Sequence, residues 1–312
     1  MPKLNHPWLV AVWPGMGNVA LNAGIYLLAK LGMTVLAELD SPNLFDIDHV
    51  EVKEGLIQSA KRPRHRFLLW SDPKKKHDLV IFLGEVQPAI GKYAFCRQII
   101  SFAQDIGVER VFTFAAMATQ MHPSDRSRVF GIATDEMNLV QLQQMDLEVL
   151  KDGNIGGLNG VLLGAAAEMG LQGACLLGEM PHIFTQLPFP KASLAILERF
   201  SLLADLDLDM DELETQARLM EQRLGEILSR LQQNIAPEGQ ENLEEEESFL
   251  QPESATVEDE GLSSNDLQKI ESLFTQAEKD RSKAFILKQE LDRLKVFKEY
   301  EDRFLDLFKK SS

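Results

Sequence analysis

Short apolar segments alternate with helix-like segments along most of the chain, and this alternation restricts the fold more than any single motif. Apolar runs bounded by charge or glycine are typical of buried strands, and amphipathic stretches between them are typical of helices. The expected strands include Trp8–Trp13, Met33–Asp40, His77–Glu85 and Val108–Thr119, and the expected helices include Val19–Leu31 and Tyr93–Ile106. We therefore predict an α/β fold, a three-layer α/β/α sandwich.

The segment Asp152–His182 contains an unusual concentration of glycine. We predict a loop over GNIGGLNG, a helix of small residues over VLLGAAAEMG, and a buried strand over GACLLGEM. This order places Gly156, Gly157 and Asn159 at one edge of the sheet and Glu179 at the carboxyl end of a strand, where open α/β sheets usually bind ligands. The alternative is that these glycines only relieve crowding between helix and sheet.

The loop after the first predicted strand carries a G-x-G-x-x-A pattern formed by Gly15, Gly17 and Ala20. Asp40 follows 25 positions after Gly15, at the end of the second predicted strand. A dinucleotide-binding fold has an acid at that place for the ribose, so this βαβ context is compatible with a dinucleotide site. Pro14 favours the alternative that the glycines form a tight turn for its own sake.

Further local predictions concern the middle of the chain. Glu51–Gln58 and Arg66–Trp70 both alternate apolar and polar residues, with the basic segment KRPR between them, so we expect these two strands to pair as a hairpin. We also expect a strand over Phe130–Ala133 and a helix over Asp135–Leu147.

The composition restricts the kinds of molecule that we expect this protein to bind. The 312 residues are 45% hydrophobic, enough for a sizeable core, and their formal net charge of −16 argues against nucleic acid or an anionic membrane as main partner. Ten acids and no Lys or Arg fall within Glu238–Glu260, so the rest of the chain sums to −16 + 10 = −6.

Cysteine usage and hydropathy suggest a cytoplasmic location. Cys96 and Cys175 lie far apart in apolar contexts, too few for a disulfide framework or a zinc site, and we predict no metal and no cofactor. No signal peptide precedes the first predicted strand, and no apolar run reaches the roughly 18 residues of a membrane span.

The charge distribution suggests three parts. We expect an α/β/α core over residues 1–235, an acidic disordered linker over 236–262 and an amphipathic helical tail over 263–312. The tail repeats apolar residues at near-heptad spacing, so it must pack on the core, on another helix or on a partner protein. The repeating residues include Leu267, Ile270, Phe274, Leu287, Leu291, Leu294, Phe297 and Phe304.

The order of several segments resembles the proteasome assembly chaperone 2 family. The matching segments include PGMGNVALNAGIYLLAKLGMTVLAEL, HDLVIFLGE, GVERVFTFAAMAT, DGNIGGLNGVLLGAAAEMGLQGACLLGE and PFPKASLAILERFSLLADLDLDMDELETQA, and they cover roughly residues 7–231. The resemblance implies a fold related to the nucleoside phosphorylases and homo-oligomers such as trimers. Several members dock on proteasomes through a C-terminal hydrophobic-Tyr-any tripeptide. The sequence ends LFKKSS, which departs from that tripeptide.

Two functions follow from these patterns. The first is a non-catalytic homo-oligomer that acts through protein–protein interaction, because the chain has no G-x-S-x-G elbow, no zinc-ligand spacing and no P-loop. The second is a nucleoside- or nucleotide-binding protein, or a phosphorylase- or hydrolase-like enzyme, that uses the loops at the strand ends. Its candidate ligand-binding residues are Gly15, Gly17, Asn18, Glu85, Asn154, Gly156, Gly157, Asn159, Glu179 and His182. A carboxylate and a histidine there could serve general acid–base chemistry.

Overall fold

The computed structural model describes residues 3–45, 50, 52–53, 55–58, 62–145, 147–234 and 262–309. These residues form two compact units, one made of residues 1–221 and 308–312 and the other of residues 222–307. The predicted acidic linker lies almost entirely outside the described residues.

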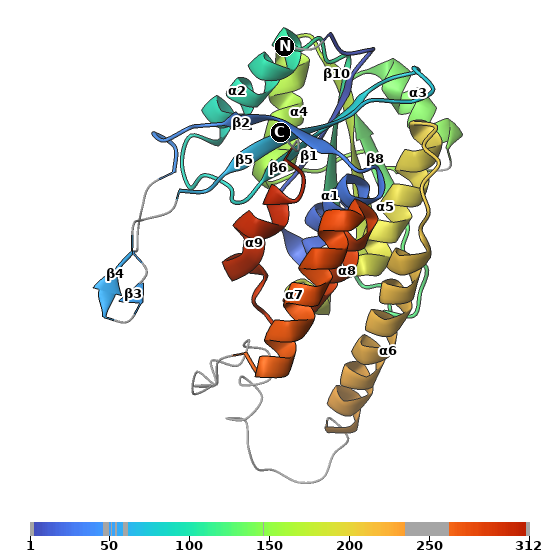
Figure 1. The fold of residues 1–312 in the computed structure, drawn as a ribbon. Coiled ribbons are helices and arrows are strands. Elements are labelled where there is room, and N and C mark those ends of the chain that lie inside the picture. The colour runs from blue at the N-terminus through green and yellow to red at the C-terminus, as the bar shows by residue number, and fades with distance from the viewer. Residues whose placement is uncertain are drawn as a thin grey trace. The chain divides into compact units, whose positions relative to one another are not determined.

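An eight-stranded mixed sheet is the centre of the first unit (Figure 1). Four parallel strands form its middle, in the order β6 (Leu79–Gly84), β1 (Trp8–Val12), β7 (Arg110–Thr119) and β10 (Gln172–Pro181). Two antiparallel strands flank them, β5 (His65–Trp70) beside β6 and β8 (Val129–Ala133) beside β10. β2 (Thr34–Leu39) and β9 (Glu148–Val149) complete the two ends.

Helices cover both faces of this sheet, so the predicted three-layer α/β/α arrangement is confirmed (Figure 1). α2 (Lys92–Asp105) and α4 (Gly157–Glu168) lie on one face, where Phe95 meets Phe82 and Leu163 packs closely against Gly173. α1 (Val19–Lys30), α3 (Glu136–Gln144) and α5 (Pro190–Leu203) lie on the other face, where Phe200 packs on Phe112.

Burial explains why the parallel strands carry long apolar runs. Every residue of β6 is buried, and Leu9, Val10 and Ala11 of β1 are wholly inaccessible to solvent. A strand covered by helices on both faces has no polar side, so its sequence reads as a continuous hydrophobic segment. The free thiols of Cys96 and Cys175 are buried in the same layers, and burial raises the pKa of each to about 12.

The predicted βαβ unit of β1, α1 and β2 has parallel strands, and β5 and β6 lie between them in the sheet. One strand pairing differs from the sequence predictions. Arg66–Trp70 belongs to β5 of the main sheet, whereas β3 (Val52–Lys53) and β4 (Leu56–Ile57) pair with each other in a separate hairpin. Strand order depends on contacts between distant segments, which local alternation does not encode.

The outer edge of β2 is partly covered by the end of the chain. The Val35 amide donates to the Phe308 carbonyl oxygen at 2.9 Å, and the Phe308 side chain is buried. Both residues belong to the first unit. Because an unpaired edge strand offers its amides to other chains, this contact protects part of the β2 edge.

α6 (Asp211–Asn234) runs from the first unit into the second. The rest of the described second unit consists of α7 (Ser264–Lys279), the short 3-10 turn Arg281–Lys283, α8 (Ala284–Arg293) and α9 (Phe297–Asp306), so the predicted tail is a set of short helices. These helices hold one another through the Phe274–Tyr300 ring contact and the paired hydrogen bonds of Arg303 to Glu271. No helix within the described ranges is long and apolar enough to cross a membrane.

Candidate functional site

The carboxyl ends of β6, β1, β7 and β10 meet at one edge of the sheet, which we call the strand-end edge. Most of the candidate residues predicted from the sequence lie along this edge or in the loops that rise from it. The antiparallel strands β5 and β8 begin at the same edge, since His65 pairs with Gly84 and Val129 pairs with Gly178. Both contribute residues that no sequence pattern indicated.

The loop after β1 is fastened to the loop after β10. The Gly17 amide donates to the Thr185 carbonyl at 2.8 Å, and the Phe189 amide donates to the Gly17 carbonyl at 2.9 Å. Gly17 has φ +57, and a Cβ built there would lie 2.8 Å from Met180 Cε. Only glycine combines that conformation with so close an approach, so Gly17 serves the packing of the two loops.

Gly15 and Asn18 flank this contact. Asn18 also has a positive φ, 50°, and precedes α1 without a side-chain capping bond. A Cβ built at Gly15 would have no atom within 4 Å, so that side of the loop is open. Asp40 follows β2, three strands away from β1, or about 14 Å at normal strand spacing. The structure therefore does not bring Asp40 to the Gly15–Gly17 loop as a dinucleotide site requires.

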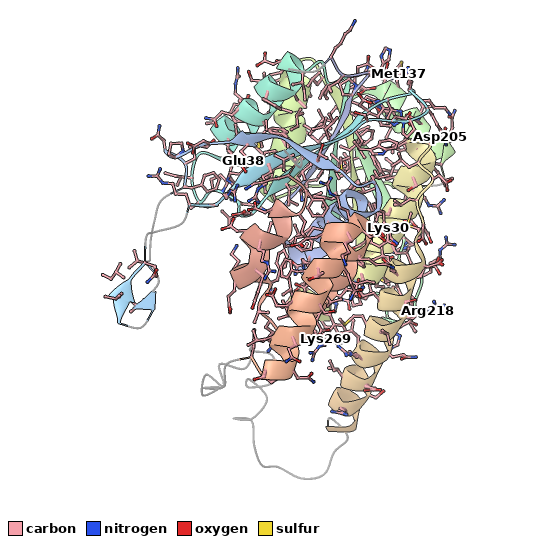
Figure 2. The ribbon with its side chains drawn as sticks, viewed as in Figure 1. Lys30, Glu38, Met137, Asp205, Arg218 and Lys269 are labelled. Carbon is pink, nitrogen blue, oxygen red and sulfur yellow. The ribbon has the colours of Figure 1, made fainter. Side chains whose placement is uncertain are left out.

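Glu85 follows β6 and is held by β5. Its Oε1 accepts a hydrogen bond from Arg66 Nη1 at 3.1 Å, and its Oε2 accepts one from the Arg64 amide at 2.7 Å. The Arg66 side chain is 1% exposed and the Glu85 side chain 10% exposed. Arg66 also reaches Glu38 of β2, labelled in Figure 2, at 3.4 Å. Because both oxygens of the Glu85 carboxylate accept hydrogen bonds from Arg64 and Arg66, this side chain holds the start of β5 in place.

His65 lies beside this ion pair, packed against the rings of Phe45 and Phe95. It is 1% exposed, and neither ring nitrogen has a hydrogen-bond partner among the described residues. Burial, together with the neighbouring Arg66 charge, lowers the pKa of His65 to about 4. The imidazole is therefore neutral at physiological pH.

Glu179 lies near the end of β10 and is held by the start of β8. Arg128 donates to it from Nη2 at 2.6 Å and from Nε at 2.7 Å, and Thr119 Oγ1 donates at 2.7 Å. The Glu179 side chain is 2% exposed. The Arg128 bonds hold the pKa of Glu179 below its usual range, against the opposing effect of burial. Glu179 is thus ionised and saturated with donors.

His182 does not form a pair with Glu179. Its Nδ1 lies 3.2 Å from the Thr119 carbonyl oxygen, while Glu179 accepts from the hydroxyl of that same threonine. His182 is exposed, in the short 3-10 turn His182–Phe184. The acid–base pair considered from the sequence is therefore two separate groups on either side of Thr119.

The glycine-rich segment becomes helical earlier than the sequence predicted, because α4 begins at Gly157. Gly157 has φ +70, and the next amide, Leu158 N–H, donates to Gln87 Oε1 at 3.2 Å. Gln87 Nε2 donates to the Pro14 carbonyl at 3.4 Å, so this side chain joins α4 to the loop after β1. Gln87 has no motif around it and was not among the predicted site residues.

Asn159 lies in the first turn of α4 and not in a loop. Its Oδ1 is buried without a hydrogen-bond partner among the described residues, as is Nε1 of Trp13 at the end of β1. Asn154 is exposed, and a Cβ at Gly156 would have no atom within 4 Å. No three described His, Cys, Asp or Glu side chains gather closely enough to hold a metal ion.

Large apolar side chains project from the strand-end loops, and no sequence pattern indicated them. Met16 is 45% exposed after β1, and Ile90 is 77% exposed after β6. Ile183 and Leu187, after β10, are 43% and 38% exposed. We call these four residues the strand-end patch. The hydrogen bonds of Gly17 to Thr185 and Phe189 hold the loops of Met16, Ile183 and Leu187 together.

Solved structures share this architecture. A protein from Pyrococcus furiosus described as PbaB, an archaeal proteasome activator, matches with a TM-score of 0.63 and 24% identity, covering 73% of this chain and 95% of that one. A PAC2 family protein from Streptomyces avermitilis matches with a TM-score of 0.61 and 27% identity, covering 70% and 95%. A proteasome-assembly chaperone homologue from Mycobacterium tuberculosis has a TM-score of 0.61 and 21% identity, covering 75% and 97%.

Sequence comparison agrees with the structural matches. An uncharacterized protein of Methanocaldococcus jannaschii is 28% identical over 231 residues, which are 72% of this chain and 84% of that protein. The model of the PAC2 family matches residues 9–228, which include every strand-end loop and all of the described sheet except Trp8. The chain therefore belongs to the PAC2 family.

Proposed function

We propose that this protein is a non-catalytic homo-oligomer that acts by binding other proteins, in the manner of the proteasome assembly chaperones of its family. Membership of the PAC2 family supports this proposal. So does the likeness to the Pyrococcus furiosus proteins described as a proteasome activator and as a homologue of a proteasome-assembly chaperone. The trimer is the assembly that we expect.

The proposal depends on one observation: at the strand-end edge the carboxylates of Glu85 and Glu179 are paired with arginines, while large apolar side chains are exposed. Glu85 and Glu179 are both tied to arginines, which leaves neither carboxylate available as a proton acceptor in the state described. Met16 and Ile183 instead offer apolar surface on loops that are braced by hydrogen bonds, and Ile90 adds an exposed apolar side chain after β6. Exposed apolar side chains that gather on one edge are typical of a protein-binding surface.

The strand-end patch can be tested with purified proteasome subunits of the same organism, immobilised and exposed to this protein. We expect binding that falls at least tenfold in a Met16→Asp/Ile183→Asp variant, because a charge in a desolvated apolar contact is costly. Leu219→Asp, at a 56% exposed leucine on α6, is the matched control and should bind normally. Equal binding by the double variant would contradict the role of the patch, and no binding by any form would contradict the proteasome role.

A second candidate function is the binding of a nucleoside or nucleotide at the same edge, with or without turnover. The observation in its favour is the pair of buried, unpartnered polar atoms, Asn159 Oδ1 and Trp13 Nε1. Such atoms are rare in native structures and often face an ordered water or a ligand. Gly15 follows Trp13 by two residues and Gly156 precedes Asn159 by three, and a Cβ at either glycine would have no atom within 4 Å.

A thermal-shift screen with nucleosides, inorganic phosphate and dinucleotides separates the two candidates. The protein-binding proposal predicts no ligand that raises the melting temperature by more than about 1 °C. A rise of several degrees with one ligand, lost in Asn159→Ala, would favour the small-molecule function, because a ligand stabilises the state that it binds.

A further inference from the structure

The hairpin β3–β4 exposes nearly all of its apolar surface. Val52 and Ile57 face each other across the two strands and are 65% and 74% exposed, and Leu56 is 69% exposed. An isolated two-stranded hairpin is at best marginally stable in water, and here each strand has only two residues. The hairpin therefore gains stability when another surface covers these side chains.

A groove between α3 and α5 offers such a surface. Its volume is about 550 Å³, and its lining residues are Gln141, Gln144, Met145, Arg199, Leu202 and Leu203. Leu202 is 69% exposed, and on the adjoining surface of α3 Met137 and Val140 are 71% and 49% exposed. Figure 2 labels Met137 on α3. Met137, Val140, Gln141 and Gln144 follow helical spacing, so they form one face of α3.

The hairpin and the groove belong to opposite ends of the sheet. The hairpin is inserted between β2 and β5, the first two strands in sheet order, while α3 and α5 pack on β8 and β10 near the other end. From β5 to β10 or β8 there are four or five strand spacings, about 19–24 Å. Ile57 is eight residues from His65, the first residue of β5, and eight residues span at most about 26–29 Å when fully extended. To enter the groove of its own chain, the hairpin would need nearly all of that length, whereas the groove of a second copy imposes no such condition.

The groove also carries a positive charge, the guanidinium of Arg199. Arg199 donates to the Met145 carbonyl at 3.5 Å and has no carboxylate partner within the part of the chain that the structure describes. In the sequence, Glu51 precedes Val52 and Glu54 stands between the two hairpin strands. A guanidinium is well suited to bind a carboxylate in a partly buried contact, so Arg199 suits a partner segment whose sequence contains acids.

We propose that the β3–β4 hairpin of one copy docks into the α3–α5 groove of the next copy. Val52, Leu56 and Ile57 pack on Met145, Leu202 and the exposed face of α3. Because the two surfaces differ, the contact is heterologous and closes into a ring when the rotation between copies permits it. This inference rests on the self-association in the proposed function and assigns the surfaces that produce it.

Disulfide cross-linking tests the contact directly, because the native thiols of Cys96 and Cys175 are buried. We would mix Ile57→Cys protein with Leu202→Cys protein, oxidise the mixture and separate it under denaturing conditions. A species of about 70 kDa, twice the 35.1 kDa chain, is expected in the mixture and not in either protein alone. Ile57→Cys mixed with Leu219→Cys is the control and should give none. An Ile57–Ile57 product alone, or no Ile57–Leu202 product, would overturn the proposal.

Solution mass separates this inference from the proposed function. We expect Ile57→Asp and Leu202→Asp each to lower the oligomeric mass measured by light scattering, and Leu219→Asp to leave it unchanged. A wild-type oligomer that neither hairpin nor groove variant disturbs would overturn this docking mode and leave self-association standing. A wild-type monomer at micromolar concentration would contradict both.

Discussion

At each side of the strand-end edge an arginine neutralises a glutamate, but the more deeply buried member of the ion pair differs between the two sides. On one side, β5 brings Arg66 to Glu85, and the arginine is the more deeply buried member, with its side chain 1% exposed. On the other side, β8 brings Arg128 to Glu179, and here the carboxylate is buried while the Arg128 side chain is 53% exposed. Each antiparallel strand thus enters the sheet beside a parallel strand that ends in an acid, and neutralises that acid.

This difference decides which charge suffers when the pair is broken. Loss of Glu85 leaves the buried guanidinium of Arg66 without this partner, whereas loss of Glu179 leaves the guanidinium of Arg128, which is already about half exposed to solvent. Breaking a buried ion pair is costly mainly because of the charge left behind. The same kind of substitution should therefore have unequal effects at the two sides.

The largest effect is expected for Glu85→Gln, which removes a carboxylate from the buried Arg66. We expect the free energy of unfolding to fall by about 3–5 kcal/mol at neutral pH, measured by urea denaturation. Glu38→Gln is the matched control, because Glu38 contacts the same arginine at 3.4 Å from a side chain that is 43% exposed. It should cost less than about 1 kcal/mol. Equal losses would show that the burial of Arg66 does not set the cost.

The second prediction uses His65, which occurs only on the β5 side. Its pKa is lowered to about 4 in the folded state from 6.5, so the unfolded chain binds the extra proton first as pH falls. Stability from the neutral imidazole is full above pH 6.5 and is lost on acidification towards pH 4, on the order of 3 kcal/mol in all.

His65→Phe should remove most of this dependence of stability on pH between pH 6.5 and pH 4, measured as the free energy of unfolding at each pH. A smaller slope remains, because burial also lowers the pKa of His77. A variant with the wild-type slope would contradict the neutral, buried state of His65.

The third prediction concerns Glu179→Gln on the β8 side, which should cost about 1–2 kcal/mol at neutral pH because Arg128 is rehydrated. The Arg128 bonds lower the pKa of Glu179 below the usual 4.5, so its stabilisation is present above that pH and is lost as pH falls through the folded-state pKa. The wild type should therefore lose its advantage over the variant below about pH 4.5. An advantage that persists into strong acid would contradict the ion pair.

The smallest effect separates two adjacent glycines at the start of α4. Gly157→Ala should cost about 1 kcal/mol, because Gly157 has φ +70 and a Cβ there would lie 3.1 Å from Gln87 Oε1. Gly156→Ala is the control, because Gly156 has φ −76 and open space around it, and it should be nearly neutral. Melting temperatures of the pair suffice, and similar shifts would mean that the backbone at Gly157 is not constrained.

Much of the edge could be predicted from the sequence, because it depends on local patterns. Apolar runs located β1, β6, β7 and β10, and their shared direction brings Gly15, Glu85, Glu179 and the start of α4 to one edge. The role of Arg66 could not be predicted, since its strand seemed to belong to a peripheral hairpin. Its place depends on β5 pairing with both β2 and β6, which is a contact between distant segments.

The strand-end patch and the Arg128–Glu179 pair could not be predicted from the sequence, for a similar reason. Arg128 lies 51 residues before Glu179, in a loop whose sequence, SDRSRV, resembles any solvated turn. Met16 and Ile183 stand in unrelated segments, and only the folded loops bring them to the same edge. Exposure is a property of the whole structure, so a methionine in a loop carries no local signal that it will remain in water.

We propose that this protein acts by association with itself and with other proteins, and its solution mass tests the self-association most directly. Sedimentation equilibrium at micromolar concentration and neutral pH should return a multiple of the 35.1 kDa chain mass, with about 105 kDa expected for the trimer. A single species of 35.1 kDa at that concentration would contradict it.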